Sequence, residues 1–421
     1  MTLGRQSALA LALVGVLPVV APASAQLDSA APRISLITVG PGPIYWERFG
    51  HNMIRVTDPA RGTDLAYNFG IFDWNQENFL WNFVQGRMLY AVDAWDAGRT
   101  LAFYERTGRS IEVQELAFTP AQARRVADNL ARNIEPDQRN YRYDYYRDNC
   151  STRVRDALNA ALGGTLEREL GHIPTHSTYR SETAELTAGD PALYFGLMLL
   201  LGPATDEPLT AWEESFIPMA FAAHLAPITV PAADGAPVPV VSASSMLPAR
   251  NPAFGASRSA ASLLRWFLVG GVLLGGMLAW AGSRSGAGQG RVPFVVLGSL
   301  WSLLSGLVGF VMVYLWAFTD HVVAYRNENM LQASVLGLAV FGLMAGWARR
   351  GGAAPAGVRA LSVTIALLSV AGVALKFIPG PIQVNGVVLA FFVPANLGMA
   401  LGALRAAPAT TGPTEGLPSR P

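Results

Sequence analysis

The stretch Asp148-Asn149-Cys150-Ser151-Thr152-Arg153-Val154-Arg155-Asp156 contains the only cysteine of the chain. The residues from Ser151 to Leu162 are expected to form a helix that ends at Gly163-Gly164, a common helix stop. Cys150 then lies in the first turn, where unpaired backbone N–H groups and the helix dipole favour a thiolate. A thiolate is the reactive form of cysteine, so this position suits a nucleophile. The alternative from position alone is a small buried hydrophobic residue.

Residues 1–25 have the features of an export signal. Arg5 supplies the positive start, Ala8 to Val20 the apolar core, and Ala23-Ser24-Ala25 the small-residue cleavage site. Export would place the following domain in an oxidising compartment, where cysteines usually pair. Because Cys150 has no second cysteine in the chain, an exported free thiol favours chemistry over packing.

Composition indicates a soluble part joined to a membrane part. The 421 residues are 51% hydrophobic and 14% charged, with a formal charge of +1. Near-neutral charge without a basic run argues against a nucleic-acid partner. Residues 26–226 are expected to form an exported α+β domain with an antiparallel sheet and a helical extension, because strand and helix patterns mix without strict alternation. The strands are predicted at residues 33–39, 51–57, 65–72 and 110–118, with a helix from Thr119-Pro120 to Ala131.

A membrane region is predicted after a linker. Residues 227–260 are rich in Pro, Ala and Ser and are expected to be a linker or a loose strand pair. Residues 261–405 contain five apolar runs that approach the roughly 20 residues needed to cross a bilayer. These runs cover about residues 263–281, 292–318, 331–348, 360–375 and 384–404.

The distribution of basic residues predicts the orientation in the membrane. One set of loops carries Arg284, Arg291, Arg349, Arg350, Arg359 and Arg405, whereas the other set carries only Arg326 and Lys376. The positive-inside rule places the arginine-rich set in the cytoplasm. This agrees with an export signal that sends the first domain outward, and predicts a multi-pass membrane protein with its C-terminus in the cytoplasm. Residues 406–421 would be a cytoplasmic, disordered tail.

A thiol enzyme also needs a base, and His51 is the best candidate. It follows Arg48-Phe49-Gly50 and begins a strand, so its ring can be held rigidly. A histidine on a strand that faces a cysteine at a helix start is the papain-type dyad, here in reversed chain order. His172 and His176 flank Pro174 and are weaker candidates. No cysteine or carboxylate cluster accompanies them at ligand spacing, so no metal is expected.

The loop of residues 319–329 is polar and is predicted to lie on the same side of the membrane as Cys150. At this position the loop would meet a lipid headgroup or a glycerol ester. The candidates for substrate binding are therefore Asp320, His321, Asn327 and Asn329. A solvated loop without a functional role is the alternative.

Several short motifs together resemble the bacterial lipoprotein N-acyltransferase Lnb family. They are Phe49-Gly50-His51, Tyr67-Asn68-Phe69-Gly70, Gly86, Tyr143-Asp144 and Asp148-Asn149-Cys150-Ser151-Thr152-Arg153. The helical tail, with its Thr-Asp-His and Asn-x-Asn loop, is similar to the membrane part of that family. The order of histidine before cysteine resembles circularly permuted NlpC/P60 (papain-like) domains. Phe69 stands where the family pattern leads us to expect a tyrosine.

The resemblance implies acyl transfer through a thioester on Cys150, with no cofactor. The donor would be a membrane phospholipid and the acceptor the α-amine of a diacylglyceryl-cysteine lipoprotein, both held in the bilayer. His51 would move the protons. Asn68 would orient the imidazole, and the amide N–H of Cys150 or the side chain of Asn149 would support the oxyanion. Arg153 is a further candidate for substrate binding, with a structural ion pair as its alternative.

Three other functions share parts of this pattern. An NlpC/P60-type cysteine hydrolase would cut cell-wall peptides with the same dyad but needs no membrane helices. A phospholipase or thioesterase would form the same acyl-enzyme and admit water. A non-catalytic lipid-binding membrane protein would tolerate loss of the thiol.

Overall fold

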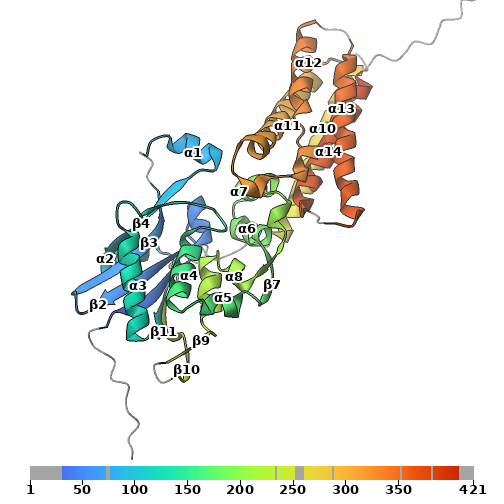
Figure 1. Cartoon of the computed structure of the whole chain (residues 1–421). Helices are drawn as coiled ribbons and strands as arrows, with labels where there is room; N and C mark the ends of the chain where they lie inside the picture. Colours follow the sequence, from blue (N-terminus) through green and yellow to red (C-terminus); the bar gives the residue numbers. More distant parts are fainter. Residues whose placement is uncertain are drawn as a thin grey trace, which may run out of the picture.

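The computed structural model describes residues 31–72, 76–232, 235–251, 260–286, 289–350, 353–380 and 383–406. The predicted signal peptide and the predicted tail after Ala406 lie outside these residues. An N-terminal part of strands and helices is followed by a bundle of long helices, as Figure 1 shows.

The N-terminal part is built on an antiparallel sheet. Within the described residues the sheet has seven strands in the order β11-β5-β1-β2-β3-β4-β6. The strands are β1 (Arg33–Val39), β2 (His51–Asp58), β3 (Thr63–Ile71), β4 (Leu89–Asp96), β5 (Ile111–Leu116), β6 (Asn140–Arg142) and β11 (Val241–Leu247). Every pairing is antiparallel. The predicted α+β class is therefore confirmed; the permuted papain-like assignment stays a prediction.

Helices cover both faces of the sheet. On one face α3 (Pro120–Asn133) and α4 (Cys150–Ala161) bury Val126, Leu130, Val154 and Leu158 against Ile34, Leu36 and Ile54. On the other face α2 (Ala97–Thr107) packs Leu101 against Ile37, Val39 and Met53. Alternate strand residues point to opposite faces, so the apolar runs in β1 and β2 supply both cores.

The segment predicted as a linker or a loose strand pair contains a strand pair and a further strand that joins the main sheet. Within the described residues of 227–260, β9 (Thr229–Pro231) pairs with β10 (Pro237–Pro239), and β11 pairs with β5. Most residues of β11 are exposed, because β11 is an edge strand of the sheet. An exposed edge strand lacks the apolar alternation by which a strand is predicted from sequence, so the sequence does not predict β11.

A group of short elements lies between the sheet and the bundle. It comprises α5 (Thr165–Leu170), β7 (Pro174–Thr178), α6 (Tyr179–Thr187), α7 (Pro191–Leu200), β8 (Pro208–Thr210), α8 (Ala211–Glu214) and α9 (Pro218–Leu225). The apolar α7 lies against the bundle. Its Phe195 ring stacks on Phe267 at 4.3 Å between centroids and contacts Phe391 edge-on. One side of α7 is thus covered by the bundle.

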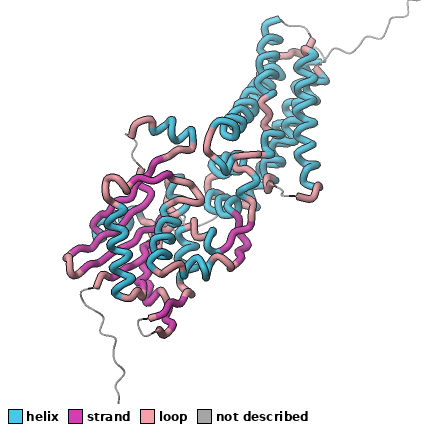
Figure 2. The backbone as a smooth tube through the Cα atoms, in the orientation of Figure 1, coloured by secondary structure: helices cyan, strands magenta, loops and turns pink. Residues whose placement is uncertain are grey.

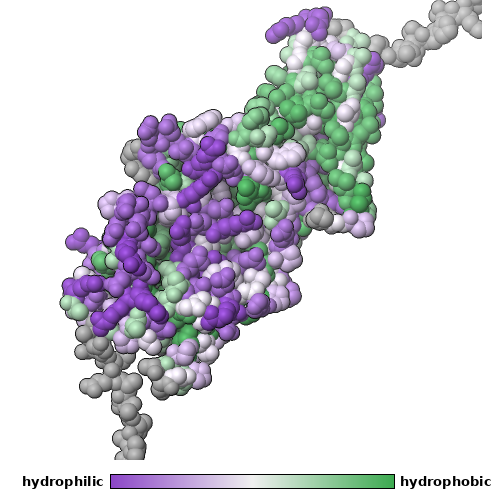
Figure 3. Space-filling view, in the orientation of Figure 1, coloured by the Kyte–Doolittle hydropathy of each residue, from purple (hydrophilic) through white to green (hydrophobic). Residues whose placement is uncertain are grey.

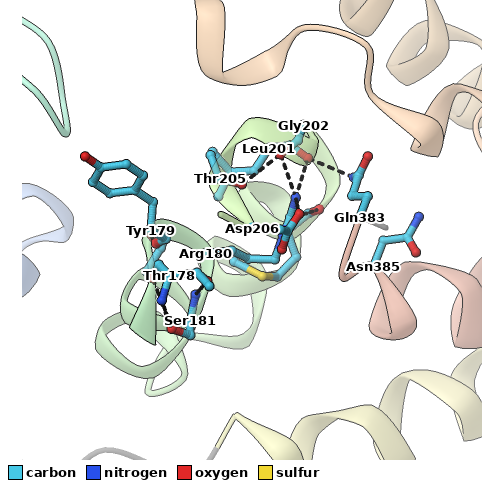
Figure 4. Close-up of polar contacts among 12 residues, drawn as sticks. Thr178, Tyr179, Arg180, Ser181, Leu201, Gly202, Thr205, Asp206, Gln383 and Asn385 are labelled. Atoms are coloured by element: carbon cyan, nitrogen blue, oxygen red, sulfur yellow. Dashed lines mark hydrogen bonds and ion pairs between the residues drawn. The ribbon is translucent and has the colours of Figure 1, made fainter. Parts of the chain in front are cut away.

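A buried arginine holds this junction together (Figure 4). Arg180 pairs with Asp206 at 2.7 Å, and both side chains are less than a tenth exposed. The same guanidinium donates to the carbonyl oxygens of Leu201 and Gly202. The Leu201 oxygen also accepts from Gln383, which precedes the last membrane helix, at 2.9 Å. One backbone turn is therefore shared by the N-terminal part and the bundle.

Five apolar spans in the described part of the chain are long enough to cross a membrane, which confirms the predicted helical region. The helices are α10 (Ala261–Gly286), α11 (Val292–Phe318), α12 (Leu336–Arg350), α13 (Ala356–Ala374) and α14 (Gly386–Arg405). A turn of 3-10 helix, η5 (Glu328–Leu331), belongs to the third span. Figure 2 shows the bundle as helices joined by loops, and Figure 3 shows its apolar surface beside the polar N-terminal part.

Glycines bring α10 and α14 into close contact. A Cβ at Gly275 would lie 2.2 Å from the carbonyl oxygen of Pro394, and one at Gly398 would lie 2.1 Å from the oxygen of Gly275. Side chains larger than hydrogen do not fit at either position. Small residues allow this approach of helix backbones inside a membrane.

Candidate active site

Cys150 is the first residue of α4, as the sequence predicts, and Asn149 caps the helix. The Asn149 Oδ1 accepts from the backbone N–H groups of Ser151 and Thr152 at 2.9 and 3.0 Å. Its Nδ2 donates to the carbonyl oxygens of Tyr145 and Phe216. The whole amide is thus engaged in holding the helix start, and no donor of this side chain is left for an oxyanion.

The thiol lies at the beginning of β2. The backbone N–H groups of Asn52, Ser151 and Cys150 point at the sulfur and favour its ionised form. Burial opposes them and is the larger effect, so the pKa of the Cys150 thiol is raised above its ordinary value. The expected resting thiolate is therefore not what the structure favours, because desolvation at the helix start outweighs the amide groups.

Asn52 fixes the helix against the strand. Its Nδ2 donates to the hydroxyl of Ser151 at 3.0 Å, and that hydroxyl donates to the carbonyl oxygen of Ser215 at 2.7 Å. Asn52 is wholly buried. This contact places the start of α4 beside β2, the strand that also carries His51.

His51 is the first residue of β2 and is held by Asn68 on β3. The imidazole Nε2 lies 2.6 Å from the Asn68 Oδ1. An amide oxygen only accepts, so Nε2 carries the proton and Nδ1 is left as an acceptor. The preceding Gly50 has φ 80°, and a Cβ there would meet the Val39 oxygen at 2.9 Å, so glycine is required at this turn.

The electrostatics keep this imidazole neutral. Burial lowers the pKa of His51 to about 4, the Asn68 hydrogen bond acts in the opposite direction, and the charge of Arg109 lowers it further. At neutral pH Cys150 is therefore a thiol and His51 a neutral imidazole. Such an imidazole can accept a proton during an attack by sulfur.

Arg109 is a part of the site that the sequence did not reveal. The side chain is buried, donates to the Gly40 oxygen at 2.8 Å and pairs with Glu47 at 3.4 Å. Its positive charge lowers the pKa of Cys150 as well as that of His51. A lone arginine before a strand carries no motif, so only the three-dimensional arrangement shows its position.

Three groups converge above Gly70, at a bulge in β3. A Cβ built on Gly70 would lie 3.5 Å from Cys150 Cβ, 4.0 Å from the Tyr141 hydroxyl and 4.0 Å from the Tyr143 ring. Gly70 has φ 90°, a conformation that glycine adopts without strain. The Tyr141 hydroxyl is buried and forms no hydrogen bond by distance and angle within the described chain. A hydroxyl donor therefore lies near the sulfur.

The loop after α11 reaches the N-terminal part. Asp320 pairs with Arg87 at 2.9 Å and with Arg142 at 2.7 Å. His321 Nε2 lies 3.0 Å from the Phe83 oxygen, and its ring stacks on Tyr145 at 6.2 Å. Tyr145 contacts Tyr143, which adjoins Cys150. His321 is thus separated from the thiol by two tyrosine rings.

The other predicted substrate ligands have internal partners. Asn327 and Asn329 are buried and donate to carbonyl oxygens at the end of α7, at 2.9 Å and 3.0 Å for Leu199. Arg153 makes a two-point pair with Asp148 and stacks over Tyr141 at 4.2 Å. The two asparagines join α7 to the bundle and are left out of the site that we propose.

His172 and His176, the weaker candidates for a base, lie on the protein surface. His176 lies on β7, outside the main sheet, and both it and His172 are exposed. Across the described ranges, no group of three or more His, Cys, Asp or Glu side chains is arranged to hold a metal ion.

Comparison with known proteins identifies the N-terminal part. A family model described as the Lnb N-terminal periplasmic domain matches residues 21–183. The match includes His51, Asn68 and Cys150, and the five apolar spans lie after it. No curated protein and no solved structure matches the chain.

Proposed function

Because residues 21–183 belong to the Lnb N-terminal periplasmic domain family, we propose that this multi-pass membrane protein is a lipoprotein N-acyltransferase. It would move an acyl chain from a phospholipid, through a thioester on Cys150, to the α-amine of a diacylglyceryl-cysteine lipoprotein. One observation carries the proposal. The thiol adjoins the backbone N–H of Asn52, directly after His51, whose ring is oriented by Asn68.

The first half-reaction forms the thioester. His51 Nδ1 accepts the thiol proton while the sulfur attacks the ester carbonyl of the phospholipid. The negative oxygen of the tetrahedral intermediate accepts hydrogen bonds from the N–H groups of Cys150 and Asn52 and from the Tyr141 hydroxyl. The carbon–oxygen bond then breaks, and the leaving oxygen takes the proton from the imidazolium. A lysophospholipid departs.

The second half-reaction transfers the acyl chain. The neutral α-amine of the lipoprotein attacks the thioester carbonyl, and His51 accepts one amine proton. The carbon–sulfur bond breaks, the imidazolium returns its proton to the sulfur, and an amide remains on the lipoprotein. No redox change and no cofactor take part in this sequence of bonds.

The membrane helices suit this pair of substrates, because both are held in a bilayer leaflet by acyl chains. The end of α11 and its loop meet the N-terminal part through Asp320 and His321. The opposite ends of the helices carry Arg284, Arg291, Arg349, Arg350, Arg359 and Arg405. This distribution supports the proposal that the helices cross the bacterial inner membrane with the arginine-rich ends and the C-terminus in the cytoplasm.

Intact-mass analysis tests the proposal. The purified full-length protein, incubated with phospholipid vesicles alone, is expected to gain one acyl chain that hydroxylamine removes and that Cys150→Ala lacks. Added diacylated lipopeptide should discharge the chain and become N-acylated. Release of free fatty acid without N-acyl peptide would identify a lipid hydrolase, and an unmodified protein would reject the thioester.

A further inference from the structure

The surface between the membrane helices and the thiol is unusually rich in partly exposed aromatic rings. On α11 the rings of Phe310, Tyr314 and Phe318 form a column, with centroid separations of 6.5 and 5.8 Å. They are four residues apart and therefore share one side of the helix. Phe310 is 51% and Phe318 66% exposed. This side of α11 is thus open to the acyl chains of a surrounding bilayer.

The middle ring of the column contacts α1 (Phe79–Gln85), a short helix of the N-terminal part. Gln85 donates to the Tyr314 hydroxyl at 2.7 Å, and its carbonyl oxygen accepts from the N–H of Asp320 at 2.8 Å. Figure 1 shows α1 reaching from the sheet toward the bundle. These bonds place α1 beside the end of a membrane-spanning helix.

The outer surface of α1 is apolar. Leu80 is 72% and Trp81 59% exposed, and Phe83 and Val84 are also exposed. A soluble surface rarely presents such a contiguous group of large apolar side chains. Trp and Phe are favoured where protein enters the boundary of a bilayer. Continuity with the lipid-facing side of α11 indicates that this group meets membrane lipid.

A chain of ring contacts continues from α1 to the thiol. Phe83 stacks on Phe79 at 6.5 Å, Phe79 on Phe72 at 6.2 Å, and Phe72 contacts Tyr90 at 5.5 Å. Tyr90 stacks on Tyr143 at 4.1 Å. The Tyr143 ring and Cys150 Cβ both lie within 4.0 Å of the position that a Cβ on Gly70 would occupy. Ring contacts thus extend from α1 to the nucleophile, and Gln85 joins α1 to the ring column of α11.

We propose that these rings, from Phe310 on α11 across α1 to Tyr143, form the path along which a phospholipid acyl chain leaves the bilayer and reaches Cys150. The inference rests on the proposed acyl transfer and adds a binding site to it. Flat rings offer apolar contact along the whole route. Their side chains lose little conformational entropy when a flexible acyl chain binds to them. Gly70 leaves the last step open beside the sulfur.

Photocrosslinking tests the path without requiring turnover. The full-length Cys150→Ser protein is placed in phosphatidylethanolamine–phosphatidylglycerol vesicles that contain a phospholipid with a diazirine on one acyl chain. After irradiation, adducts are expected within residues 76–90 and 140–146 as well as in the membrane helices. Adducts confined to the five helices would overturn the path.

A matched pair of variants adds a second measurement. Phe83→Glu places a charge on the path and should lower labelling of residues 140–146 and the rate of acylation of Cys150 by about tenfold. Trp95→Glu changes an equally exposed ring near the far end of β4 and should leave both unchanged. Equal behaviour of the two variants would contradict the path.

The two proposals fail in distinguishable ways. Labelling of residues 140–146 without an acyl adduct on Cys150 in the unmodified protein would retain the path and reject the transferase. An acyl adduct without labelling of those residues would retain the transferase and reject the path.

Discussion

The Nε2 atom of His51 and the Oδ1 atom of Asn68 lie 2.6 Å apart, across the neighbouring strands β2 and β3. The Tyr104 ring also lies near the imidazole, with 6.2 Å between the ring centroids of Tyr104 and His51. The hydrogen bond to Asn68 fixes the imidazole in one tautomer, with Nδ1 as its acceptor. The proposed mechanism depends on this orientation.

Replacement of Asn68 should change how acylation depends on pH. In the unmodified protein His51 loses its proton above about pH 4, so the rate of thioester formation should fall only below that pH. Asn68→Asp adds a carboxylate that stabilises the imidazolium and raises the pKa of His51. In Asn68→Asp we expect the fall in rate at acidic pH to move toward neutral pH. Asn68→Ala should instead lower the rate by about 100-fold at all pH values. If the rate of Asn68→Asp fell at the same acidic pH as that of the unmodified protein, Asn68 would not influence the base.

Alkylation of Cys150 should report a protonated thiol. Burial raises the pKa of the thiol, so the thiolate fraction is small at neutral pH and grows with pH. The rate with iodoacetamide should rise by about tenfold per pH unit to beyond pH 9. Arg109→Gln removes a charge that favours the thiolate and should slow alkylation at a fixed pH. A plateau between pH 6 and 8 would indicate a preformed ion pair instead.

Tyr141→Phe should lower the rate of acylation by about 100-fold, the effect expected when one donor to an oxyanion is removed. Alkylation of Cys150 by iodoacetamide creates no oxyanion and should keep its rate. Tyr146→Phe is the matched control, because the Tyr146 hydroxyl is paired with Thr183 at 2.9 Å. We expect near-normal acylation in that variant. An equal loss in both variants would indicate general damage to the fold.

Gly86→Ala should weaken the contact between α1 and the loop after α11. A Cβ at Gly86 would lie 3.0 Å from the backbone of Asp320 and His321, and φ is 69°. Gly163→Ala carries the same kind of strain at φ 63°, of about 1 kcal/mol, with no atom within 4 Å of the added carbon. Only Gly86→Ala should slow acylation in vesicles, by about tenfold. Equal rates would show that close docking of the loop is dispensable.

Loss of one partner of the buried Arg180–Asp206 pair should destabilise the junction. Asp206→Ala leaves a buried guanidinium without its carboxylate, which costs about 3–5 kcal/mol. The double variant Arg180→Met/Asp206→Leu removes both charges and should recover much of that loss. The stability of the single and the double variant is measured by thermal unfolding of the detergent-solubilised protein, with proteolytic cleavage near Gly202 as the readout. If the double variant were no more stable than the single one, the stabilising contribution of Arg180 would come from its hydrogen bonds to Leu201 and Gly202.

Much of the fold follows from local sequence signals. The alternation in residues 33–39 predicts β1, and the turn residues before 63 predict the β2–β3 hairpin. These signals exist because each strand has a buried face. Thr119-Pro120 predicts the start of α3, where Thr119 does cap the helix. The edge strand β11 escapes prediction because its pairing with β5 spans more than a hundred residues of chain and leaves most of its side chains exposed.

The site was predictable only where a side chain carries the chemistry. Cys150, His51 and Asn68 are recognisable because thiol, imidazole and amide have specific roles, and their catalytic use remains a prediction. The amide of Asn52 and the charge of Arg109 act through position alone, which no local pattern encodes. Asn327 and Asn329 look like exposed ligands in the sequence, yet their hydrogen bonds to α7 are formed inside the protein.

The place of β11 in the sheet has a consequence for biogenesis. β11 ends at Leu247, and the first membrane helix begins at Ala261. In the proposed topology, translocation therefore delivers β11 immediately before the first membrane helix is inserted. Until then β5 presents an unpaired edge to the periplasm. Maturation of the soluble part is therefore timed to membrane insertion, and nascent chains arrested before residue 241 should be cleaved by periplasmic proteases.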